Sequence, residues 1–234
     1  MAVSYNATKA RKFNRELQRI MDQDTYHELF PQATLARSPS SQAARKSRNY
    51  ARNADECEIV GYPGCFKTIG VGGSLTGEPV DILIMDDLYK DAAAAWSPLI
   101  RQNIADWYDT VASTRLHNSS QQLLVFTRWH EDDLAGRLLQ KEGLYHPTDN
   151  PHGWVLLSFP AIKDSSPSPL DPRAEGEVLW PERHNLEKLL QIKQRNGAVF
   201  ESLYQQNPQP SQGLMYEEFQ CDTEIPSRTY SVAY

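Results

Sequence analysis

Two runs of apolar residues in the middle of the chain have the length of buried β-strands. The first run, VDILIMDD, spans residues 80–87 and ends in two carboxylates, and the second, QLLVFT, spans residues 122–127. Neither run alternates with polar residues, and such runs are typical of strands covered on both faces in a parallel sheet. A third run, WVLLSF at residues 154–159, predicts one further strand.

Amphipathic helices are predicted before and between these strands. Residues 8–21 carry apolar side chains three and four positions apart with basic residues between them, and Asn6 or Thr8 provides an N-cap. Residues 97–111 begin with a Ser-Pro pair, which suits an N-cap and a first helical position. The buried stripe of this second helix is predicted to consist of Ile100, Ile104, Trp107, Tyr108 and Val111.

Further helices are predicted after the second strand. The acidic residues at 131–133 suit the first turn of a helix, and Gly143 is a suitable stop for it. A last helical pair covers residues 185–206, with Asn185 as its cap and Gly197 between the two helices. Because strands and helices alternate along the chain, the pattern predicts an α/β fold with a parallel sheet.

The bulk composition restricts the class of protein. The 234 residues are 40% hydrophobic, which is enough for a core, and the formal net charge is −6. This charge argues against a protein whose whole surface binds nucleic acid. Three cysteines without metal-ligand spacing argue against a disulfide framework, and no apolar run reaches the length of a membrane span. The composition therefore predicts a soluble protein of a reducing cytoplasm.

The stretch GYPGCFKTIG at residues 61–70 has features of a phosphate-binding loop. Lys67 and Thr68 fit the end of the G-x-x-x-x-G-K-[ST] template, but Phe66 stands where a glycine must let the backbone approach the phosphates. Residues 69–79 contain four glycines and a proline, so the helix that must follow a phosphate loop cannot form. We therefore predict a hairpin or an irregular strand pair here.

Asp86 and Asp87 are the first candidates for chemistry. A parallel strand that ends in adjacent carboxylates places them in the crevice where open α/β sheets bind ligands. In nucleotide hydrolysis one carboxylate holds the Mg²⁺ that neutralises phosphate charge, and a second group orients or deprotonates the attacking water. The alternative is that the two aspartates only cap the following loop.

A second candidate cluster lies in FTRWHEDDLAGRLL at residues 126–139. It puts Thr127, Arg128 and His130 at the end of the next strand, where a polar group could hydrogen-bond a γ-phosphate or the attacking water. His130 together with the acids at 131–133 also raises the question of a metal site. The helix dipole already accounts for three acids at the start of a helix.

Basic side chains gather between residues 37 and 54, a segment without any acidic residue. A solvated loop is the simplest interpretation, and the alternative is a contact to DNA phosphate or to nucleotide. The candidate contact residues are Arg37, Arg45, Lys46, Arg48 and Arg52.

Five segments, taken in order, resemble the large subunit of the bacteriophage terminase, the ATP-driven motor that packages viral DNA into a procapsid. They are distributed over residues 4–210 of the chain, and TRWHEDDLAGRLL beside a double-aspartate strand is a specific combination. The segments are SYNATKARKFNRELQRI at 4–20, GVGGSLTGEPVDILIMDDLYKD at 70–91, WYDTVASTRL at 107–116, FTRWHEDDLAGRLL at 126–139 and LYQQNPQP at 203–210.

The resemblance implies an incomplete P-loop NTPase-like (RecA-type) parallel sheet flanked by helices, with a C-terminal helical and linker segment. It maps the Mg²⁺-binding Walker B aspartate onto Asp86 and the catalytic carboxylate onto Asp87, although the family more often has Glu at the latter position. Thr127 matches the coupling motif, which links hydrolysis to DNA movement. Arg128 and His130 follow within the same motif.

The resemblance also implies a domain organisation. Residues 1–163 match the later part of the motor domain, residues 164–228 the linker and helical segment, and residues 229–234 the start of an RNase H-like nuclease domain. The family's phosphate loop is expected before the first residue, and its first nuclease aspartate after the last. Pro, Ser and charged residues at 164–177 are typical of a linker, whereas Glu78 departs from the basic or neutral residue expected after LTG.

Cofactors and partners follow from the same resemblance. Intact relatives are expected to use Mg²⁺ and ATP, and to bind double-stranded DNA, a portal protein and a small terminase subunit. They are expected to form a homo-oligomeric ring at the procapsid portal in the host bacterial cytoplasm, away from membranes. Because the phosphate loop supplies most of the nucleotide-binding energy, we expect this chain alone to show little or no ATPase or nuclease activity.

Two other functions are consistent with the sequence. One is a non-catalytic assembly module that docks on another terminase chain supplying the missing strand and loop, and its mark would be an exposed sheet edge with apolar surface. The other is a stand-alone nuclease that uses Asp86, Asp87 and the acids at 131–133.

Overall fold

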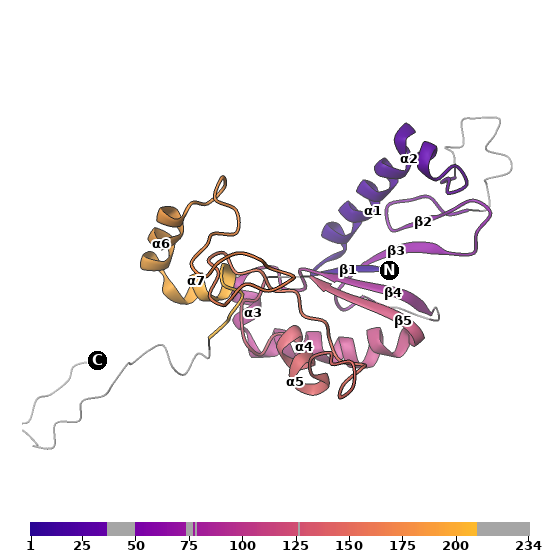
Figure 1. Ribbon diagram of the computed structural model, residues 1–234. Helices are drawn as coiled ribbons and strands as arrows, with labels where there is room; N and C mark the ends of the chain where they lie inside the picture. The colour runs from indigo at the N-terminus through magenta and orange to yellow at the C-terminus, as the bar shows by residue number, and fades with distance from the viewer. Residues whose placement is uncertain (37–49, 74–76, 78, 126, 210–234) are drawn as a thin grey trace, which may run out of the picture.

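The computed structural model describes residues 1–36, 50–73, 77, 79–125 and 127–209. These residues form an α/β fold around a five-stranded mixed sheet with the strand order β2-β3-β1-β4-β5 (Figure 1). The strands are β1 (Ala2–Ser4), β2 (Glu56–Glu58), β3 (Cys65–Gly70), β4 (Val80–Asp86) and β5 (Leu116–Val125).

Four neighbouring strands of the sheet are parallel, and only β2 at one edge runs antiparallel to its neighbour β3. The short strand β1 lies at the centre, with Ala2 beside both Thr68 of β3 and Ile84 of β4. On the other side of β4, Asp86 lies beside Val125 of β5. The prediction of an α/β fold with a parallel sheet is therefore confirmed.

Helix α1 (Ala7–Met21) covers one half of one sheet face, and the short helix α2 (Asp24–Leu29) follows it (Figure 1). The Asn6 side chain caps α1 by accepting from the Lys9 N–H at 2.8 Å, as the sequence predicts. Ala10 and Asn14 are fully buried on the side of α1 that faces β1 and β3.

The opposite face of the sheet is covered by α3 (Ala92–Trp96), α4 (Pro98–Trp107) and α5 (Leu134–Glu142) (Figure 1). A π-helical turn (Tyr108–Ala112) and a 3-10 turn (Ser113–Arg115) continue α4 toward β5. The core of the molecule lies in this layer, and its largest members are Leu83, Met85, Leu88, Tyr89, Ile104, Trp107, Tyr108, Leu134 and Leu138.

The predicted helix boundaries in this layer agree with the structure except at the start of α5, where the acidic residues 131–133 precede the first turn and do not form it. Ser97 caps α4 and Pro98 is its first residue, while Asp133 caps α5 and Gly143, with a φ of +75°, ends it. The stripe of α4 is partly different from the prediction, because Ile100 is 37% exposed.

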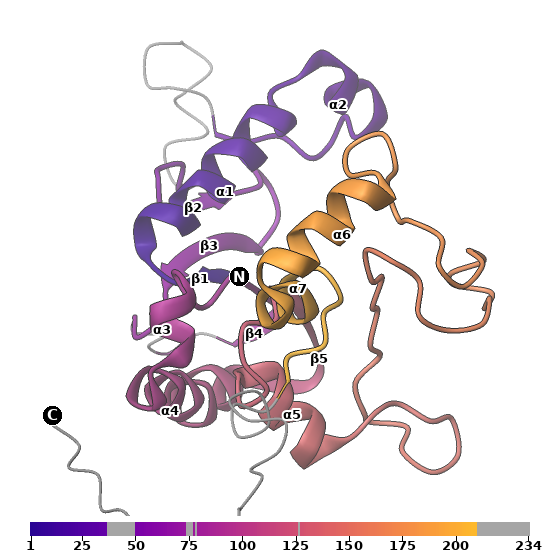
Figure 2. The same cartoon turned by 90° about the vertical axis from the view of Figure 1, so that its left-hand side faces the viewer.

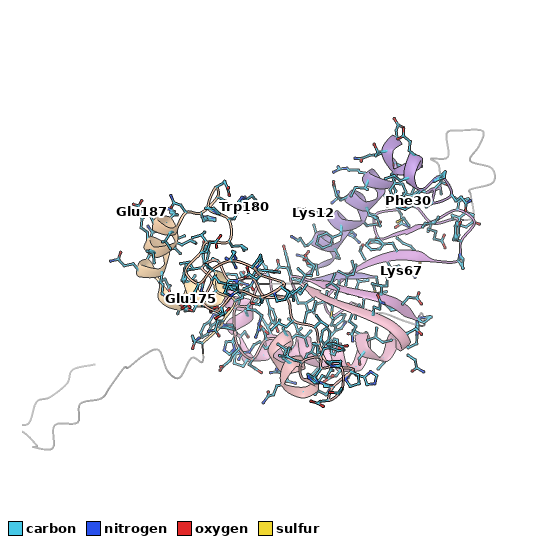
Figure 3. The ribbon with its side chains drawn as sticks, viewed as in Figure 1. Lys12, Phe30, Lys67, Glu175, Trp180 and Glu187 are labelled. Atoms are coloured by element: carbon cyan, nitrogen blue, oxygen red, sulfur yellow. The ribbon has the colours of Figure 1, made fainter. Side chains whose placement is uncertain are left out.

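The C-terminal part of the described chain contains α6 (Leu186–Arg195) and α7 (Gly197–Leu203), and it lies beyond the carboxyl ends of the sheet strands (Figures 1 and 2). Asn185 caps α6 as predicted, and Asn196 caps α7. Glu175, Trp180 and Glu187 belong to this part of the molecule (Figure 3).

The loop at residues 164–177 has no helix or strand, in agreement with the prediction. It nevertheless contains a buried ionic cluster, in which the Asp171 carboxylate lies 3.1 Å from Lys163 Nζ and 2.8 Å from Arg173 Nη2. Arg173 also donates to the Pro160 carbonyl oxygen at 3.0 Å, so this loop is fixed to the segment before it.

Three strand predictions differ from the structure. The run at 122–127 marks only the second part of β5, which begins at Leu116 and ends at Val125. The run at 80–87 was expected to be buried on both faces, but Ile82 of β4 is 51% exposed, because α1 does not extend over β4 and β5. Residues 154–159 form no strand, and only Trp154 makes an isolated bridge, to Leu144. A buried strand needs apolar side chains, but it also needs a neighbouring strand to which its backbone can form hydrogen bonds. The apolar run at 154–159 lacks that neighbouring strand.

None of the helices in the described part of the chain combines the length and the apolar character needed to cross a membrane. The predicted start of a nuclease domain at residues 229–234 lies outside the described residues, as does Glu78.

Candidate functional site

The stretch at residues 61–70 is a turn followed by a strand, in agreement with the hairpin prediction. β3 contains Phe66, Lys67 and Thr68 and pairs antiparallel with β2. Lys67, labelled on β3 in Figure 3, lies 3.7 Å from the Glu56 carboxylate on the neighbouring strand. A lysine held along a strand cannot reach phosphates cradled at a helix N-terminus.

The carboxyl ends of β1, β4 and β5 meet at one edge of the sheet, and the main chain of Asp87 joins them. The Asp87 N–H donates to the Val125 carbonyl oxygen of β5 at 2.9 Å, and the Tyr5 N–H donates to the Asp87 carbonyl oxygen at 3.1 Å. Asp87 has a φ of +51°, in the left-handed region that few residues other than glycine adopt. The backbone directly after β4 is thus fixed in an uncommon conformation at this edge.

Asp86 and Asp87 present two partly buried carboxylates here. Neither carboxylate forms a hydrogen bond or ion pair with another described residue. Burial raises the pKa of Asp86, and burial together with the charge of Asp86 raises the pKa of Asp87. Partly buried acids without a fixed partner mark a candidate site for a ligand.

Lys9 provides the nearby positive charge. It lies in the first turn of α1, directly after β1, and its charge opposes the upward pKa shift of both Asp86 and Asp87. The Lys9 ammonium lies 5.6 Å from the centre of the Phe13 ring. Sequence reasoning missed Lys9, because it depends on β1, a strand of only three residues.

Ser4 is a second residue that the sequence did not single out. It is the last residue of β1 and is fully buried, and its hydroxyl has no hydrogen-bond partner among the described residues. Because Ala2 lies beside Ile84, the alternation along the strands puts Ser4 and Asp86 on the same face of the sheet. A buried hydroxyl without a partner is uncommon, and it adds a polar group on the strand next to that of Asp86.

Gly70 allows α1 to begin close to this edge. A Cβ atom at Gly70 would lie 2.6 Å from the Ala7 nitrogen and 2.9 Å from the Asn6 Cα, distances that real Cβ atoms do not adopt. The carboxyl end of β3 therefore packs directly against the N-terminus of α1, whose positive dipole end favours nearby carboxylates.

Thr127 and Arg128 follow β5 at the same edge and line a cavity beside it. Thr127 is exposed and free of side-chain hydrogen bonds to described residues, whereas Arg128 donates through Nε to Asp133 at 2.7 Å. Of the two, Thr127 is the one whose side chain is available to a ligand.

His130 is buried below the surface and contacts Trp96 edge-to-face at 5.0 Å between ring centres. Its Nδ1 accepts a hydrogen bond from the Asp132 N–H at 3.0 Å. Burial and the charge of Arg101 lower the pKa of His130, so the ring is neutral at pH 7. These contacts give His130 a place in the packing between α3 and the loop before α5.

The acidic residues of the same loop bind arginines. Asp132 accepts from Arg101 at 3.0 Å and from Arg137 at 2.7 Å, and these bonds hold its pKa at about 2. Asp133 is fully buried, caps α5 and pairs with Arg128. The described residues contain no cluster of three or more metal-ligating side chains, so the alternative of a metal site built on His130 and the acids has no support.

The two carboxylates at the end of β4 have the donor chemistry that could hold Mg²⁺. This ion is commonly held by one or two carboxylates and completes its octahedron with water and substrate phosphates, whereas Ca²⁺ takes about six to eight oxygen ligands from the protein and water. Asp86 and Asp87 supply the smaller set, and neither carboxylate forms an ion pair with a described residue.

Of the predicted basic contacts, only Arg52 lies among the described residues; Arg37, Arg45, Lys46 and Arg48 lie outside them. Arg52 pairs with Asp22 and donates to the Ala36 carbonyl oxygen at 2.9 Å. Arg52 therefore links the backbone at Ala36 to Asp22, the residue directly after α1.

Comparison with known proteins adds no relative: neither a scan of the chain against protein-family models nor a search of curated proteins finds a match.

Proposed function

We propose that this chain is part of a terminase large subunit of a tailed bacteriophage or prophage and contributes the metal-binding edge of an ATP-driven DNA-packaging motor. The observation that carries the proposal is the pair of partly buried, unpaired carboxylates of Asp86 and Asp87 at the carboxyl end of β4. The order of the matching segments along the sequence supports it as well. A P-loop NTPase-like sheet is the finer fold assignment that belongs to this proposal.

In the proposed site Asp86 would hold Mg²⁺, and the ion would supply positive charge to neutralise the phosphates of a nucleotide. Asp87 acts on the attacking water. Its pKa is raised by burial and by Asp86, which makes its carboxylate a better proton acceptor than a solvated aspartate. Its backbone, fixed between Tyr5 and Val125, sets the direction of the carboxylate.

Thr127 is proposed to report the state of the nucleotide. It lies two residues beyond Val125, which is itself beside Asp86, and its hydroxyl is exposed. The ion pair of Arg128 with Asp133 fixes the backbone that follows, so a change at Thr127 would be passed to α5. Arg128 and His130 are thereby positioning residues for the coupling motif and do not contact the nucleotide.

The sequence contains no other candidate for a phosphate loop than the rejected stretch at 61–70. Since backbone N–H groups and a lysine supply most of the phosphate-binding energy, we propose that the chain alone binds MgATP weakly and hydrolyses it slowly or not at all. Double-stranded DNA, a portal protein and a small terminase subunit are the partners proposed for the complete motor.

The proposal is tested first by metal binding, because this does not require a complete nucleotide site. Mn²⁺ in place of Mg²⁺ allows the bound ion to be counted by electron paramagnetic resonance. We expect Asp86→Asn to weaken Mn²⁺ binding by at least about tenfold, while Asp81→Asn, an exposed aspartate on the same strand, leaves it unchanged. Equal Mn²⁺ binding by wild type and Asp86→Asn would contradict the proposed metal site.

ATP hydrolysis in the presence of DNA and Mg²⁺ is the second measurement. Wild type is compared with Asp86→Ala, Asp87→Asn and Lys67→Ala, and little or no turnover is expected from all four. Turnover that is lost in the aspartate variants would show a working site in this chain alone. If Lys67→Ala also abolished that turnover, the rejection of the phosphate-loop interpretation would be wrong.

A further inference from the structure

The first turn of α1 lies at the sheet edge that carries the two carboxylates. β1 ends at Ser4, and α1 begins at Ala7. In the connection between them, the Tyr5 N–H donates to the Asp87 carbonyl oxygen at 3.1 Å. The helix therefore starts close to the end of β4, with the positive end of its dipole at this edge (Figure 1).

Two N–H groups of this first turn are left without an acceptor. The first four N–H groups of a helix have no partner within the helix itself. Asn6 accepts two of them, from Lys9 at 2.8 Å through its side chain and from Ala10 at 3.1 Å through its carbonyl oxygen. The N–H groups of Ala7 and Thr8 form no hydrogen bond with a described residue. They are donors suited to an oxyanion.

Lys9 adds an ammonium group to these donors. Its side chain is half-buried and forms no ion pair with any described residue. The ammonium lies 5.6 Å from the centre of the Phe13 ring, which holds the side chain along the helix. Among the described residues, it is the one cation that shifts the pKa of Asp86 and Asp87, and it lowers both values. Lys9 is thus close to both acids and remains available to an anionic ligand.

The hydroxyl of Ser4 points into the same region. Val3 belongs to the core cluster that also contains Ile104 and Trp107 of α4. Because side chains alternate along a strand, Ser4 faces the opposite side of the sheet, where α1 and Asp86 lie. Ser4 is fully buried, and its Oγ has no partner among the described residues. An unpaired buried hydroxyl is a second sign that this region is built for a polar ligand.

The formal charges at this edge determine when an anion can bind. The two carboxylates and the Lys9 ammonium together leave one net negative charge, which repels an anion. A divalent cation held by the carboxylates turns this into one net positive charge. The site therefore accepts an anion only when the cation is present.

We propose that Lys9 and the first turn of α1 bind a phosphoryl oxyanion, and that they do so only after Asp86 has bound a divalent cation. A phosphoryl group suits both partners, because one of its oxygens can accept from N–H and ammonium donors while another coordinates the cation. The inference rests on the metal site of the proposed function and adds to it a phosphate contact outside any phosphate loop.

The test measures the binding of metal and of phosphate separately, with the full chain. Electron paramagnetic resonance follows Mn²⁺ binding with and without inorganic phosphate, and calorimetry follows phosphate binding with and without Mn²⁺. Mn²⁺ and phosphate without protein provide the blank. We expect phosphate to raise the affinity for Mn²⁺ by at least about fivefold, and Mn²⁺ to raise the affinity for phosphate by the same factor.

Two lysines of α1 provide a matched pair of variants. Lys9→Met keeps an aliphatic side chain beside Phe13 but removes the charge. It should weaken phosphate binding in the presence of Mn²⁺ by at least about tenfold. It should strengthen Mn²⁺ binding in the absence of phosphate, because a like charge is lost. A variant that was merely misfolded would bind Mn²⁺ more weakly.

Lys12→Met is the control. It removes the same charge from an exposed position on the same helix, labelled in Figure 3, and should leave both affinities unchanged. Lys9→Arg keeps the charge and should retain most of the phosphate binding.

The outcomes separate this inference from the metal site on which it rests. If Asp86→Asn and wild type bind Mn²⁺ equally, the metal site is wrong and the inference falls with it. If Mn²⁺ binds through Asp86 but phosphate leaves its affinity unchanged, only the inference is overturned. The same holds if phosphate binds equally well without Mn²⁺, or if Lys9→Met behaves like Lys12→Met.

Dimethyl phosphate identifies the source of the phosphoryl group. It is a diester with one negative charge, like a phosphate of the nucleic-acid backbone. Binding of inorganic phosphate alone would support the proposal with the terminal phosphate of a nucleotide as the ligand. Equal binding of dimethyl phosphate, with the same dependence on Mn²⁺ and Lys9, would support it with a backbone phosphate as the ligand.

Discussion

Arg128 and Asp133 form an ion pair with 2.7 Å between Nε and Oδ2, in which the carboxylate is completely buried. The other carboxylate oxygen of Asp133 accepts from the Gly136 N–H at 2.8 Å and caps α5. One aspartate thus begins the helix and fixes the arginine that follows Thr127. The most distinctive part of the sequence, TRWHEDD, owes much of its composition to this structural role.

Replacing Asp133 should reveal this double role in the free energy of unfolding. Asp133→Ala removes the partner of a largely buried arginine and the cap of α5, so we expect a loss of about 3–5 kcal/mol. Asp133→Asn keeps an acceptor for the cap and should lose less. Urea unfolding followed by circular dichroism measures both, with Asp164→Ala, at an exposed aspartate, as the control. Equal stability of Asp133→Ala and the control would contradict the assignment.

Gly136 should not tolerate a side chain, although it lies within a helix. Alanine normally stabilises a helix interior by about 1 kcal/mol relative to glycine. At Gly136, however, a Cβ would lie 1.8 Å from the Glu131 carbonyl oxygen and 3.3 Å from Arg128 Nη2. We expect Gly136→Ala to lower the melting temperature by several degrees, which corresponds to more than about 1 kcal/mol.

Gly197 provides the matched control for Gly136. It is the first residue of α7, and a Cβ there would meet nothing within 4 Å. Gly197→Ala should leave the melting temperature unchanged or raise it slightly. If both alanine variants behaved alike, the close approach of the loop to α5 would not be a constraint on the fold.

Local sequence patterns predicted most helices, strand β4 and the second part of β5. The caps at Asn6, Ser97 and Asn185 were identified because a cap and its helix are adjacent in sequence. The order of the strands could not be predicted, because β1 is only three residues long and finds its place through its neighbours β3 and β4.

Sequence patterns identified only those residues of the candidate site that directly follow a predicted strand. Asp86 and Asp87 terminate an apolar run and were found, whereas Ser4 and Lys9 depend on β1 and were missed. Residues 154–159 show the opposite error, since their apolar side chains suggested a strand that the structure leaves unpaired. Burial and pairing are properties of the whole sheet, and a local run cannot specify them.

Asp132 should make the stability of the protein depend on pH in the acid range. Its folded-state pKa of about 2 lies below the value near 4 expected for an unfolded aspartate. The stabilisation is therefore fully present above about pH 4 and is lost as the pH falls through about 2. Because the side chain is 42% exposed, screening limits the effect to about 1 kcal/mol.

The comparison of wild type with Asp132→Asn isolates this contribution. The difference in unfolding free energy should be largest at neutral pH and should disappear only below about pH 2, where the Asp132 side chain is protonated in the folded state as well. A difference that stayed constant between pH 7 and pH 2 would mean that the two arginines contribute through packing alone.

Asp86 and Asp87 should have the opposite effect, because their pKa values are raised in the folded state. A carboxyl group with a raised folded-state pKa destabilises the fold at pH values above both its folded and unfolded pKa, and this penalty disappears as the pH falls through the folded value. We therefore expect Asp87→Asn to raise the free energy of unfolding at pH 7 in the absence of divalent cations. The gain should shrink as the pH falls through the raised folded-state pKa and should be absent below about 4, the value expected for the unfolded chain.

Divalent cations should make wild type more stable than Asp87→Asn, the reverse of the order expected without them. An ion that binds the folded state stabilises it by mass action, so Mg²⁺ or Mn²⁺ should raise the melting temperature of wild type and have little effect on Asp86→Asn or Asp87→Asn. Asp81→Asn, which changes an exposed carboxylate on the same strand, should respond to the cations as wild type does. If the three variants and wild type gained equally from Mn²⁺, the ion would bind elsewhere, and the repulsion between Asp86 and Asp87 would have no part in metal binding. In the metal-free protein the two aspartates lower the free energy of unfolding at neutral pH. Such a local loss of stability is typical of a binding site, and here a bound cation would offset it.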